Sequence, residues 1–227
     1  MLKNILNTVL DFIYPNKCIF CEELIPLGEE KDICKYCYMD INFIYGDREP
    51  NLSVFYYDDI TRFSIFRLKY NNQKQYAKVF ANLMYNKISK MDTIHYDYII
   101  AVPMYLNKKK KRGYDQAEEI AKHLSYFTNI PIQTNNLIRT KNTLPQSKVS
   151  YEERKNNVKD VFTIKNPQLV KNKNILLIDD IYTTGNTINY CKKALKNAGA
   201  NDICCFTLAK VDYKKYTFTN DVDKDLI

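Results

Sequence analysis

The sequence predicts an α/β protein with a parallel sheet, preceded by a small zinc-ribbon-like module. Apolar runs typical of buried strands, over 97–104, 175–179 and 202–211, alternate with segments of helical periodicity. Such alternation favours parallel strands joined by right-handed crossovers. Two Cys-x-x-Cys pairs lie ahead of these segments. We therefore expect a helix and metal-binding module over 1–50, and an α/β domain with a polar C-terminal tail over 51–227.

The expected module depends on four cysteines. Two Cys-x-x-Cys turns place four thiolates around one tetrahedral Zn²⁺, and four sulfur ligands leave no open position, so the metal should be structural. The alternative is a pair of disulfides in a secreted protein. The ligands are Cys18, Cys21, Cys34 and Cys37.

The N-terminal segment argues against secretion. Apolar residues over 1–13 recur at helical spacing, but Asn4, Asn7 and Asp11 interrupt them and no cleavage pattern follows. No apolar run approaches the roughly 18 residues of a membrane span. We therefore expect a cytoplasmic protein.

The segments after residue 50 alternate in periodicity. A short strand is expected over 54–57, an amphipathic helix over 73–89, and a buried strand over 97–104 that ends near Pro103. The next helix is predicted to begin with Asp115 as its N-cap and Glu118 three residues later, a variant of the capping box.

Two short strands, 136–140 and 161–165, flank a polar loop of about twenty residues, a length that is more often functional than idle. Residues 139–173 contain nine basic and three acidic side chains. A basic segment suits an anionic ligand or a nucleic acid, although a solvated lysine-rich surface has the same composition.

The stretch ILLIDDIYTTGNTI, 175–188, carries the clearest functional pattern. A buried strand is expected to end at Asp179 and Asp180, followed by a loop with Gly185 and a helix capped by Thr187 and ended by Gly199. Backbone N–H groups at such a helix start, with hydroxyls beside them, suit a phosphate. The carboxylates are suited to accept hydrogen bonds from vicinal hydroxyls, so the pattern indicates a ribose 5-phosphate.

These residues resemble a known family. LLIDDIYTTGNT is similar to the phosphoribosyl-diphosphate (PRPP) signature of type I phosphoribosyltransferases. The two Cys-x-x-Cys pairs, RLKY at 67–70 and RGYDQ at 112–116 narrow the resemblance to the ComF family, associated with DNA uptake in competent bacteria. Its long-loop pattern is matched by Arg139, Gln146, Arg154, Asn157 and Phe162.

The resemblance implies a type I phosphoribosyltransferase fold and displacement of diphosphate from PRPP, with Mg²⁺, by an unidentified acceptor. The ribose hydroxyls would meet Asp179 and Asp180, and the loop 141–160 would close with Arg154 on the leaving group. The catalytic set is then Asp179, Asp180, Arg154 and Arg112. The 5-phosphate is expected at Thr183, Thr184, Gly185, Asn186 and Thr187, with Tyr182 also among the PRPP-binding residues, and the diphosphate at Pro103, Lys108, Arg112 and Gly113.

Two departures from the family pattern bear on turnover. Lys108 stands where the family usually has arginine, which loses a bidentate grip on diphosphate, and Asp115 stands where it has asparagine. A second interpretation is therefore a catalytically weak PRPP sensor, or an accessory protein that binds single-stranded DNA and DNA-uptake proteins. A third, a nucleotide-salvage transferase, fits the cysteine pairs and the 112–116 motif less well.

Overall fold

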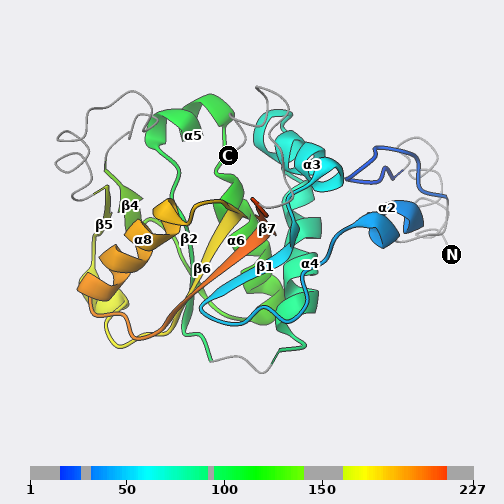
Figure 1. The fold of residues 1–227 in the computed structure, drawn as a ribbon. Coiled ribbons are helices and arrows are strands. Elements are labelled where there is room, and N and C mark those ends of the chain that lie inside the picture. The colour runs from blue at the N-terminus through cyan, green and yellow to red at the C-terminus, as the bar shows by residue number, and fades with distance from the viewer. Residues whose placement is uncertain (1–15, 27–31, 92–94, 141–160, 214–227) are drawn as a thin grey trace, which may run out of the picture.

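The computed structural model describes residues 16–26, 32–91, 95–140 and 161–213. Their strands form a five-stranded sheet in the order β1-β7-β6-β2-β3 and a separate ribbon of β4 and β5 (Figure 1). Every pair in the large sheet is parallel, and β4 pairs with β5 in antiparallel fashion. The strands are β1 Asn51–Tyr56, β2 Tyr98–Ala101, β3 Ile132–Gln133, β4 Leu137–Arg139, β5 Phe162–Ile164, β6 Ile175–Tyr182 and β7 Ile203–Lys210.

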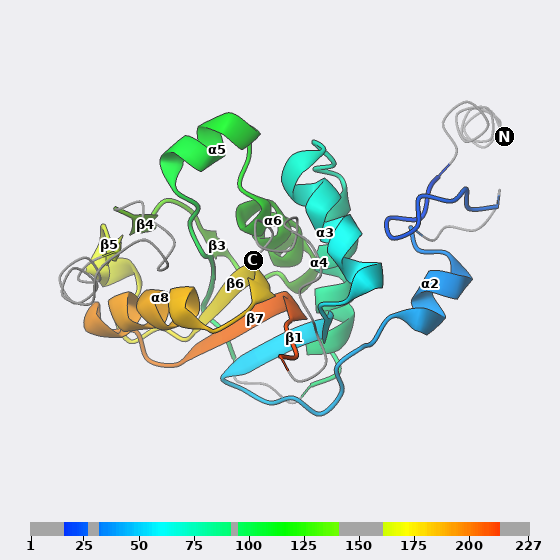
Figure 2. The same ribbon diagram turned by 45° about the horizontal axis from the view of Figure 1, so that its top comes forward.

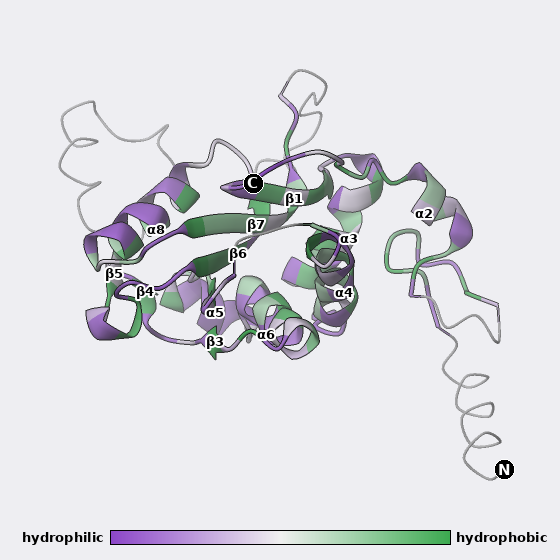
Figure 3. Cartoon of the chain, turned by 90° about the horizontal axis from the view of Figure 1, so that it is seen from below, coloured by the Kyte–Doolittle hydropathy of each residue, from purple (hydrophilic) through white to green (hydrophobic). Residues whose placement is uncertain are grey.

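Helices cover both faces of the sheet (Figures 2 and 3). The described helices are α2 Lys35–Asp40, α3 Asp59–Tyr70, α4 Tyr76–Ile88, α5 Leu106–Arg112, α6 Gln116–Thr128 and α8 Asn186–Asn197, with a 3-10 turn, η2, at Pro167–Leu169. The helices α3, α4 and α6 lie on one face and α8 on the other (Figure 3). The predicted α/β class with a parallel sheet is confirmed.

The two faces arise from the period-two alternation of β6, because successive side chains of a strand point to opposite sides. Leu176 and Ile178 belong to the apolar core shared with α3, α4 and α6, whereas Ile175 and Leu177 belong to the core under α8. All four are fully buried. This is the near-continuous apolar pattern of a strand covered on both sides.

Three local expectations needed correction. The strand over 175–179 continues to Tyr182, because β7 pairs with it as far as Tyr182 opposite Lys210. The N-cap of α8 is Gly185 and not Thr187. Asp115 caps α6 as expected and accepts from the amide of Glu118, but the Glu118 carboxylate pairs with lysines instead of completing a capping box.

The helices α3 and α5 had no counterpart in the sequence-based prediction, which placed nothing definite over 59–70 or 106–112. Asp58 caps α3 through a capping box with Thr61. The helix α5 is a seven-residue lysine-rich turn that ends at Gly113 in the left-handed region, with φ of 87°. The expected helix over 1–13, the loop 141–160 and the tail lie outside the described residues.

The cysteine-bearing segment packs against the helix face of the α/β domain. Phe20, between two of the cysteines, makes edge-on ring contacts with Phe55 of β1 and Phe80 of α4, with centroids 6.2 Å away in both cases. Ile19 and Phe20 belong to the same apolar cluster as the cores of α3 and α4. The helix α2, in contrast, has no buried residue, and it lies to the side of the domain, away from the sheet (Figure 1).

Candidate functional site

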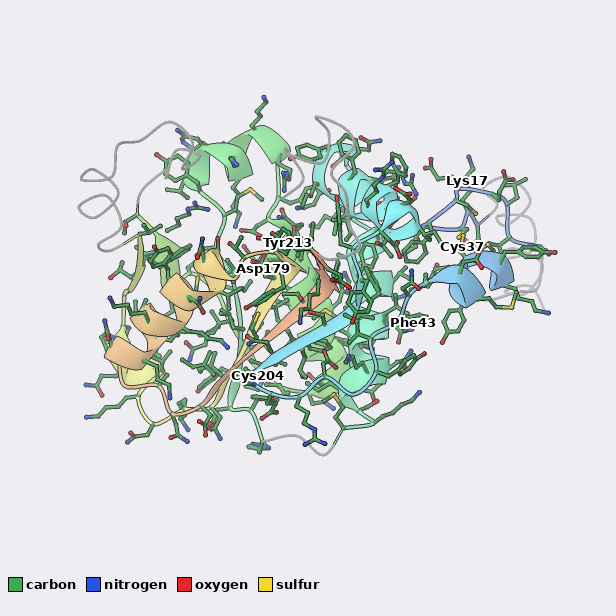
Figure 4. All side chains as sticks on the ribbon, viewed as in Figure 1. Lys17, Cys37, Phe43, Asp179, Cys204 and Tyr213 are labelled. Carbon is green, nitrogen blue, oxygen red and sulfur yellow. The ribbon has the colours of Figure 1, made fainter. Side chains whose placement is uncertain are left out.

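A cleft opens where β2 parts from β6. The two strands pair only as far as Ala101 opposite Ile178, and the amide of Val102 then donates to the Ile178 carbonyl at 2.8 Å. Beyond that point β6 is paired with β7 alone along the main chain, so the Asp179–Asp180 stretch borders a hollow at the carboxyl edge of the sheet. Ligands of open α/β sheets bind at such edges. Asp179 lies there, in the middle of the molecule (Figure 4).

The cleft has a volume of about 170 Å³ and brings together segments far apart in the sequence. It draws on the last turn of α3, the loop after β2 with α5, the start of α6, the end of β4, and the stretch from β6 into α8. Its lining residues are Lys69, Tyr70, Val102, Pro103, Met104, Lys108, Arg112, Asp115, Gln116, Arg139, Asp179, Asp180, Ile181, Thr183, Gly185, Thr187 and Ile188.

Most of the predicted site residues meet in this cleft. Tyr182, Thr184, Asn186 and Gly113 flank it without lining it. Arg154 lies outside the described residues. Sequence reasoning assigned no role to Lys69, Tyr70, Gln116 or Arg139, although each lies in a string that it had singled out. The sequence did not show which of these motifs lie around the same cleft.

Asp180 is buried and already engaged by two side chains. Its Oδ2 accepts from Gln116 Nε2 at 2.7 Å and lies 3.3 Å from Lys69 Nζ. The side chains of Lys69 and Asp180 are each 8% exposed, so this is a buried ion pair with an amide hydrogen bond beside it. Such a pair fixes geometry because opening it would leave two buried charges without compensation.

Asp179 has different surroundings. It is half-buried, and its Oδ1 accepts from the amide of Asp180 at 2.9 Å. Burial, and then the neighbouring charge of Asp180, raise the pKa of Asp179 well above its usual range. A cation or hydroxyl donors in the cleft would stabilise the charged form of this carboxylate. Of the two acids, Asp180 forms the ion pair with Lys69, and Asp179 is the one whose charged form burial disfavours most.

The stretch from β6 into α8 has the form of an anion site. Gly185 is the N-cap of α8, in the left-handed region with φ of 77°, and no side chain caps the helix. The first turn of α8 carries no acidic residue. Its amides therefore keep the positive end of the helix dipole exposed to the cleft, where Thr183 and Thr187 add hydroxyls.

Gly185 is also required by its neighbour. A Cβ at this position would lie 2.5 Å from the Tyr182 hydroxyl oxygen and 2.9 Å from Tyr182 Cζ. The ring of Tyr182 thus passes directly beside the turn, so its proposed role changes from contact with an anion to support of the loop.

The opposite wall consists of the loop after β2 and its two neighbouring helices. Asp115 is buried; its Oδ1 accepts from the first-turn amides of α6, and its Oδ2 accepts from the amide of Met104 at 2.8 Å. Asp115 therefore joins the start of α6 to the loop over 102–104. Burial raises the pKa of this carboxyl. An asparagine in its place offers only one acceptor oxygen for these two tasks.

Arg112 faces the same cleft from the end of α5. Its Nη1 donates to Gln116 Oε1, and its guanidinium lies 4.7 Å from the centroid of the Tyr70 ring. Because Gln116 also donates to Asp180, a polar chain runs from Arg112 to the acidic pair. Arg139 lies at the end of β4 over the ring of Phe162, and burial lowers the pKa of its guanidinium.

The four N-terminal cysteines form a separate site. Their sulfurs all lie within 4.8 Å of one another, and the Sγ atoms of Cys21 and Cys34 are 3.8 Å apart. Sulfurs at about 2.3 Å from a tetrahedral Zn²⁺ are about 3.8 Å from each other, so the spacing fits such an ion. None of the seven cysteines forms a disulfide, and the other three are buried core thiols. These four thiols can hold a metal ion.

Comparison with known proteins identifies the family of this chain. Residues 68–224 match the phosphoribosyl transferase domain, so the chain belongs to the phosphoribosyltransferase domain family. Competence protein F of Haemophilus influenzae is 32% identical over 154 residues, which cover 64% of this chain and 66% of that protein. Competence protein ComFC of Bacillus subtilis is 29% identical over 161 residues, 70% of this chain and 64% of that one.

With the cysteine cluster, these relatives place the chain in the ComF family. The match spans slightly less than two thirds of the length of both relatives. Among solved structures, the glutamine PRPP amidotransferase of B. subtilis superposes with a TM-score of 0.44 and 17% identity, covering 63% of this chain and 30% of that one. In the described residues, no helix has the length and apolar character of a membrane span.

Proposed function

We propose that this ComF-family protein binds PRPP with Mg²⁺ in the cleft and transfers the phosphoribosyl group to an acceptor. The observation that carries the proposal is the meeting, in one cleft, of a helix start without a side-chain cap, an acidic pair and the cationic side chains of Lys108 and Arg112. Each of these suits a different part of PRPP. In the reaction, the C1–oxygen bond breaks and its electron pair leaves with diphosphate, while the acceptor forms a bond to C1 and loses a proton.

The 5-phosphate belongs at the start of α8. The amides after Gly185 and the hydroxyls of Thr183 and Thr187 can donate to its oxygens, and the helix dipole favours its charge. Thr184 and Asn186 stay in the proposal through their main-chain amides. Because the loop is anchored by the buried strand β6, these donors are held in place before the ligand arrives.

The ribose belongs beside the acidic pair. Asp179 would accept hydrogen bonds from the ribose hydroxyls. Asp180, which is held by Lys69 and Gln116, would keep the acidic pair in position. The cleft suits Mg²⁺ because this ion typically takes one or two carboxylates and completes its shell with water and substrate oxygens. When bound, Mg²⁺ would neutralise charge on the leaving diphosphate.

The diphosphate belongs between α5 and the loop after Pro103. Lys108 and Arg112 line that wall. Arg112 is oriented by Gln116 and the Tyr70 ring, so its guanidinium is held ready to meet developing negative charge. Gly113 allows the chain to turn from α5 into α6. A contribution of Arg154 stays a prediction.

Ligand binding and turnover provide the test. PRPP with Mg²⁺ should raise the melting temperature of the wild-type protein, since binding to the native state stabilises it by mass action. Diphosphate release in the presence of an acceptor panel then measures transfer. A protein without any thermal shift would contradict the proposal.

A second candidate, a PRPP sensor that does not catalyse, is favoured by two residues of the diphosphate wall. Lys108 offers a single ammonium in place of a fork, and Asp115 places a buried carboxyl in the cleft wall. Binding of PRPP without diphosphate release across the panel would favour the sensor. If Lys108→Arg restores diphosphate release, the protein is an enzyme whose turnover is weakened by the lysine at position 108.

Single-stranded DNA is proposed as a partner because α5 presents exposed lysines at the mouth of the cleft. These residues, with the basic segment 139–173, would bind phosphates with little sequence preference and steep salt dependence. An affinity that does not change between low and physiological salt would contradict phosphate contacts. DNA-uptake proteins remain proposed partners on the family resemblance alone.

The metal of the cysteine cluster is proposed to be zinc, in a module over 1–50 joined to the transferase domain over 51–227. Four free thiols around one ion suit the reducing cytoplasm, where we place the protein. Elemental analysis of protein purified without added metal should find about one zinc per chain. Less than about half an equivalent would contradict the assignment.

A further inference from the structure

The last turn of α3 lies between the cysteine cluster and the cleft. In Figures 1 and 4 this helix stands between Cys37 and the end of β6 that carries Asp179. Residues 67–70 form this turn, and each of the four contacts a different part of the protein. The contacts of Arg67 and Lys69 are the two that matter most, because they reach the two sites.

Arg67 holds the backbone of the first cysteine turn. Its Nη2 donates to the carbonyls of Ile19 at 2.7 Å and Phe20 at 2.6 Å, the two residues between Cys18 and Cys21. Its Nη1 lies 3.5 Å from the carboxylate of Glu22. The Arg67 side chain is only 12% exposed. A charged donor bound to two carbonyls in a buried setting makes this a specific contact.

Lys69 reaches the opposite way, to Asp180 in the cleft. Residues two apart on a helix point to different sides, about 200° apart at 3.6 residues per turn. One rigid turn therefore has the metal-binding segment on one side and the acidic pair on the other. A shift of the turn toward either site changes the position of the other contact.

The turn is prevented from rotating by its two other residues. Leu68 is fully buried, and its carbonyl accepts from the Tyr114 hydroxyl. The ring of Tyr70 lies beneath the guanidinium of Arg112. Both partners come from the α5–α6 segment that forms the diphosphate wall. The turn thus connects the cysteine cluster to both walls of the cleft.

We infer that Arg67 is a positioning residue that couples the cysteine cluster to the cleft, so that metal binding strengthens PRPP binding and PRPP binding slows metal loss. The inference rests on the proposed function only in taking PRPP as the ligand of the cleft. The contacts of residues 67–70 that connect the two sites do not depend on it. A purely structural Arg67 would hold the cysteine segment without any such mutual dependence. Coupling between two sites is reciprocal by thermodynamic necessity, and this reciprocity separates the two cases.

The test compares Arg67→Met with Arg62→Met. Arg62 lies on the same helix, 3.2 Å from Asp59, with its guanidinium over the Phe63 ring, and it is not among the residues that line the cleft. Two quantities are measured on zinc-loaded protein: the dissociation constant of PRPP with Mg²⁺, and the rate of zinc transfer to a chromogenic chelator with and without PRPP.

In the wild type and in Arg62→Met, we expect PRPP to slow zinc transfer by a factor of several, because a metal ion that is bound more tightly is less often free to reach the chelator. In Arg67→Met this factor should fall toward one, and the PRPP dissociation constant should rise correspondingly. Arg67→Lys should recover only part of the coupling, since one ammonium cannot reproduce the two planar amino groups of Arg67, one on the Ile19 and Phe20 carbonyls and the other beside Glu22. Arg67→Met with unchanged PRPP affinity and unchanged slowing of zinc transfer would overturn the inference.

Hydrogen exchange provides an arm that does not need PRPP. Removing zinc from the wild type should raise amide exchange in 67–70 and 114–118 more than in β7, which is anchored in the sheet core. If zinc removal leaves amide exchange in 114–118 unchanged, the coupling is overturned, whether or not the protein binds PRPP. If exchange there rises but the protein does not bind PRPP, the coupling is supported and the proposed function is contradicted. If Arg67→Met does not fold, the exchange comparison on the wild-type protein decides by itself.

Discussion

The cysteine cluster and the acidic end of β6 are both groups of side chains suited to a cation, but they are held in place by different means. Two of the four sulfurs come from a short turn, and the other two from the N-cap and first turn of α2, a helix that buries no residue. Asp179 and Asp180 belong to a strand whose preceding four residues are fully buried. The geometry of the first group should therefore depend on its metal, and that of the second on the core.

The largest effect is expected from Cys34→Ser. Loss of one ligand should release the metal and unfold the segment around it, since structural zinc contributes on the order of 10–16 kcal/mol in small zinc modules. Zinc content and protease cleavage within 16–49 measure this. As a control, Cys204→Ala removes a buried thiol from β7 and should leave zinc content unchanged. Stoichiometric zinc in Cys34→Ser would show that Cys34 is not needed to hold the metal.

Within the acidic pair, Asp180→Asn should reduce stability far more than Asp179→Asn. Asp180 faces the Lys69 ammonium in a buried pair, and breaking such a pair typically costs about 3–5 kcal/mol. Asp179 has a raised pKa caused first by burial, so removing its charge should leave stability unchanged or higher. Urea unfolding of both variants measures the difference. Equal losses would mean that the two carboxylates share one environment.

Gly185→Ala should distort the turn at the start of α8, where we propose that the 5-phosphate binds, and leave the sheet unchanged. The new methyl would meet the Tyr182 ring, and the backbone would carry a left-handed alanine, a strain of about 1–3 kcal/mol. Gly46→Ala is the matched control, with φ of 79° and nothing within 4 Å of its new Cβ. We expect Gly185→Ala alone to lose PRPP affinity, by tenfold or more. Similar affinity in both variants would argue against a phosphate at this turn.

The smallest expected effect is the pH dependence contributed by Asp115. Burial raises the pKa of its carboxyl in the folded protein above the unfolded value, near 3.8. The folded state then binds more protons, so this contribution to stability is present below about pH 4 and is lost as pH rises through the folded pKa. Asp115→Asn removes this contribution to the pH dependence of the free energy of unfolding. The stability of wild type minus variant should therefore be more favourable near pH 4 than near pH 7, and a difference that grows with pH would contradict the sign.

Local chemistry makes several features of this protein readable from the order of its residues. Four cysteines in two Cys-x-x-Cys pairs indicate a metal site because the ligands of each pair are neighbours in the chain. The carboxylates, hydroxyls and glycine of 179–187 lie on one strand–loop–helix unit, so their order alone indicates an anion beside a diol. The class of the fold followed from the alternation of apolar runs with helical patterns.

The environments of those residues were decided by contacts between distant segments. Asp179 and Asp180 are adjacent in sequence, yet only the approach of α3 and α6 makes one a paired carboxylate and the other a carboxylate with a raised pKa. The length of β6 was misjudged because it depends on β7, which begins more than twenty residues later. Thr187 was misjudged as a cap because the backbone at Gly185 turns first.

The sequence alone therefore determined the chemical character of both sites, because the ligands of each follow one another along the chain. Tertiary structure decided how they are connected, through a helix, α3, whose turn at 67–70 the sequence marked only as a family motif. Arg67 and Lys69 are two ordinary cations in the sequence. They acquire opposite partners, a cysteine turn and a buried aspartate, because helical geometry points them to different sides and the fold places one site on each side.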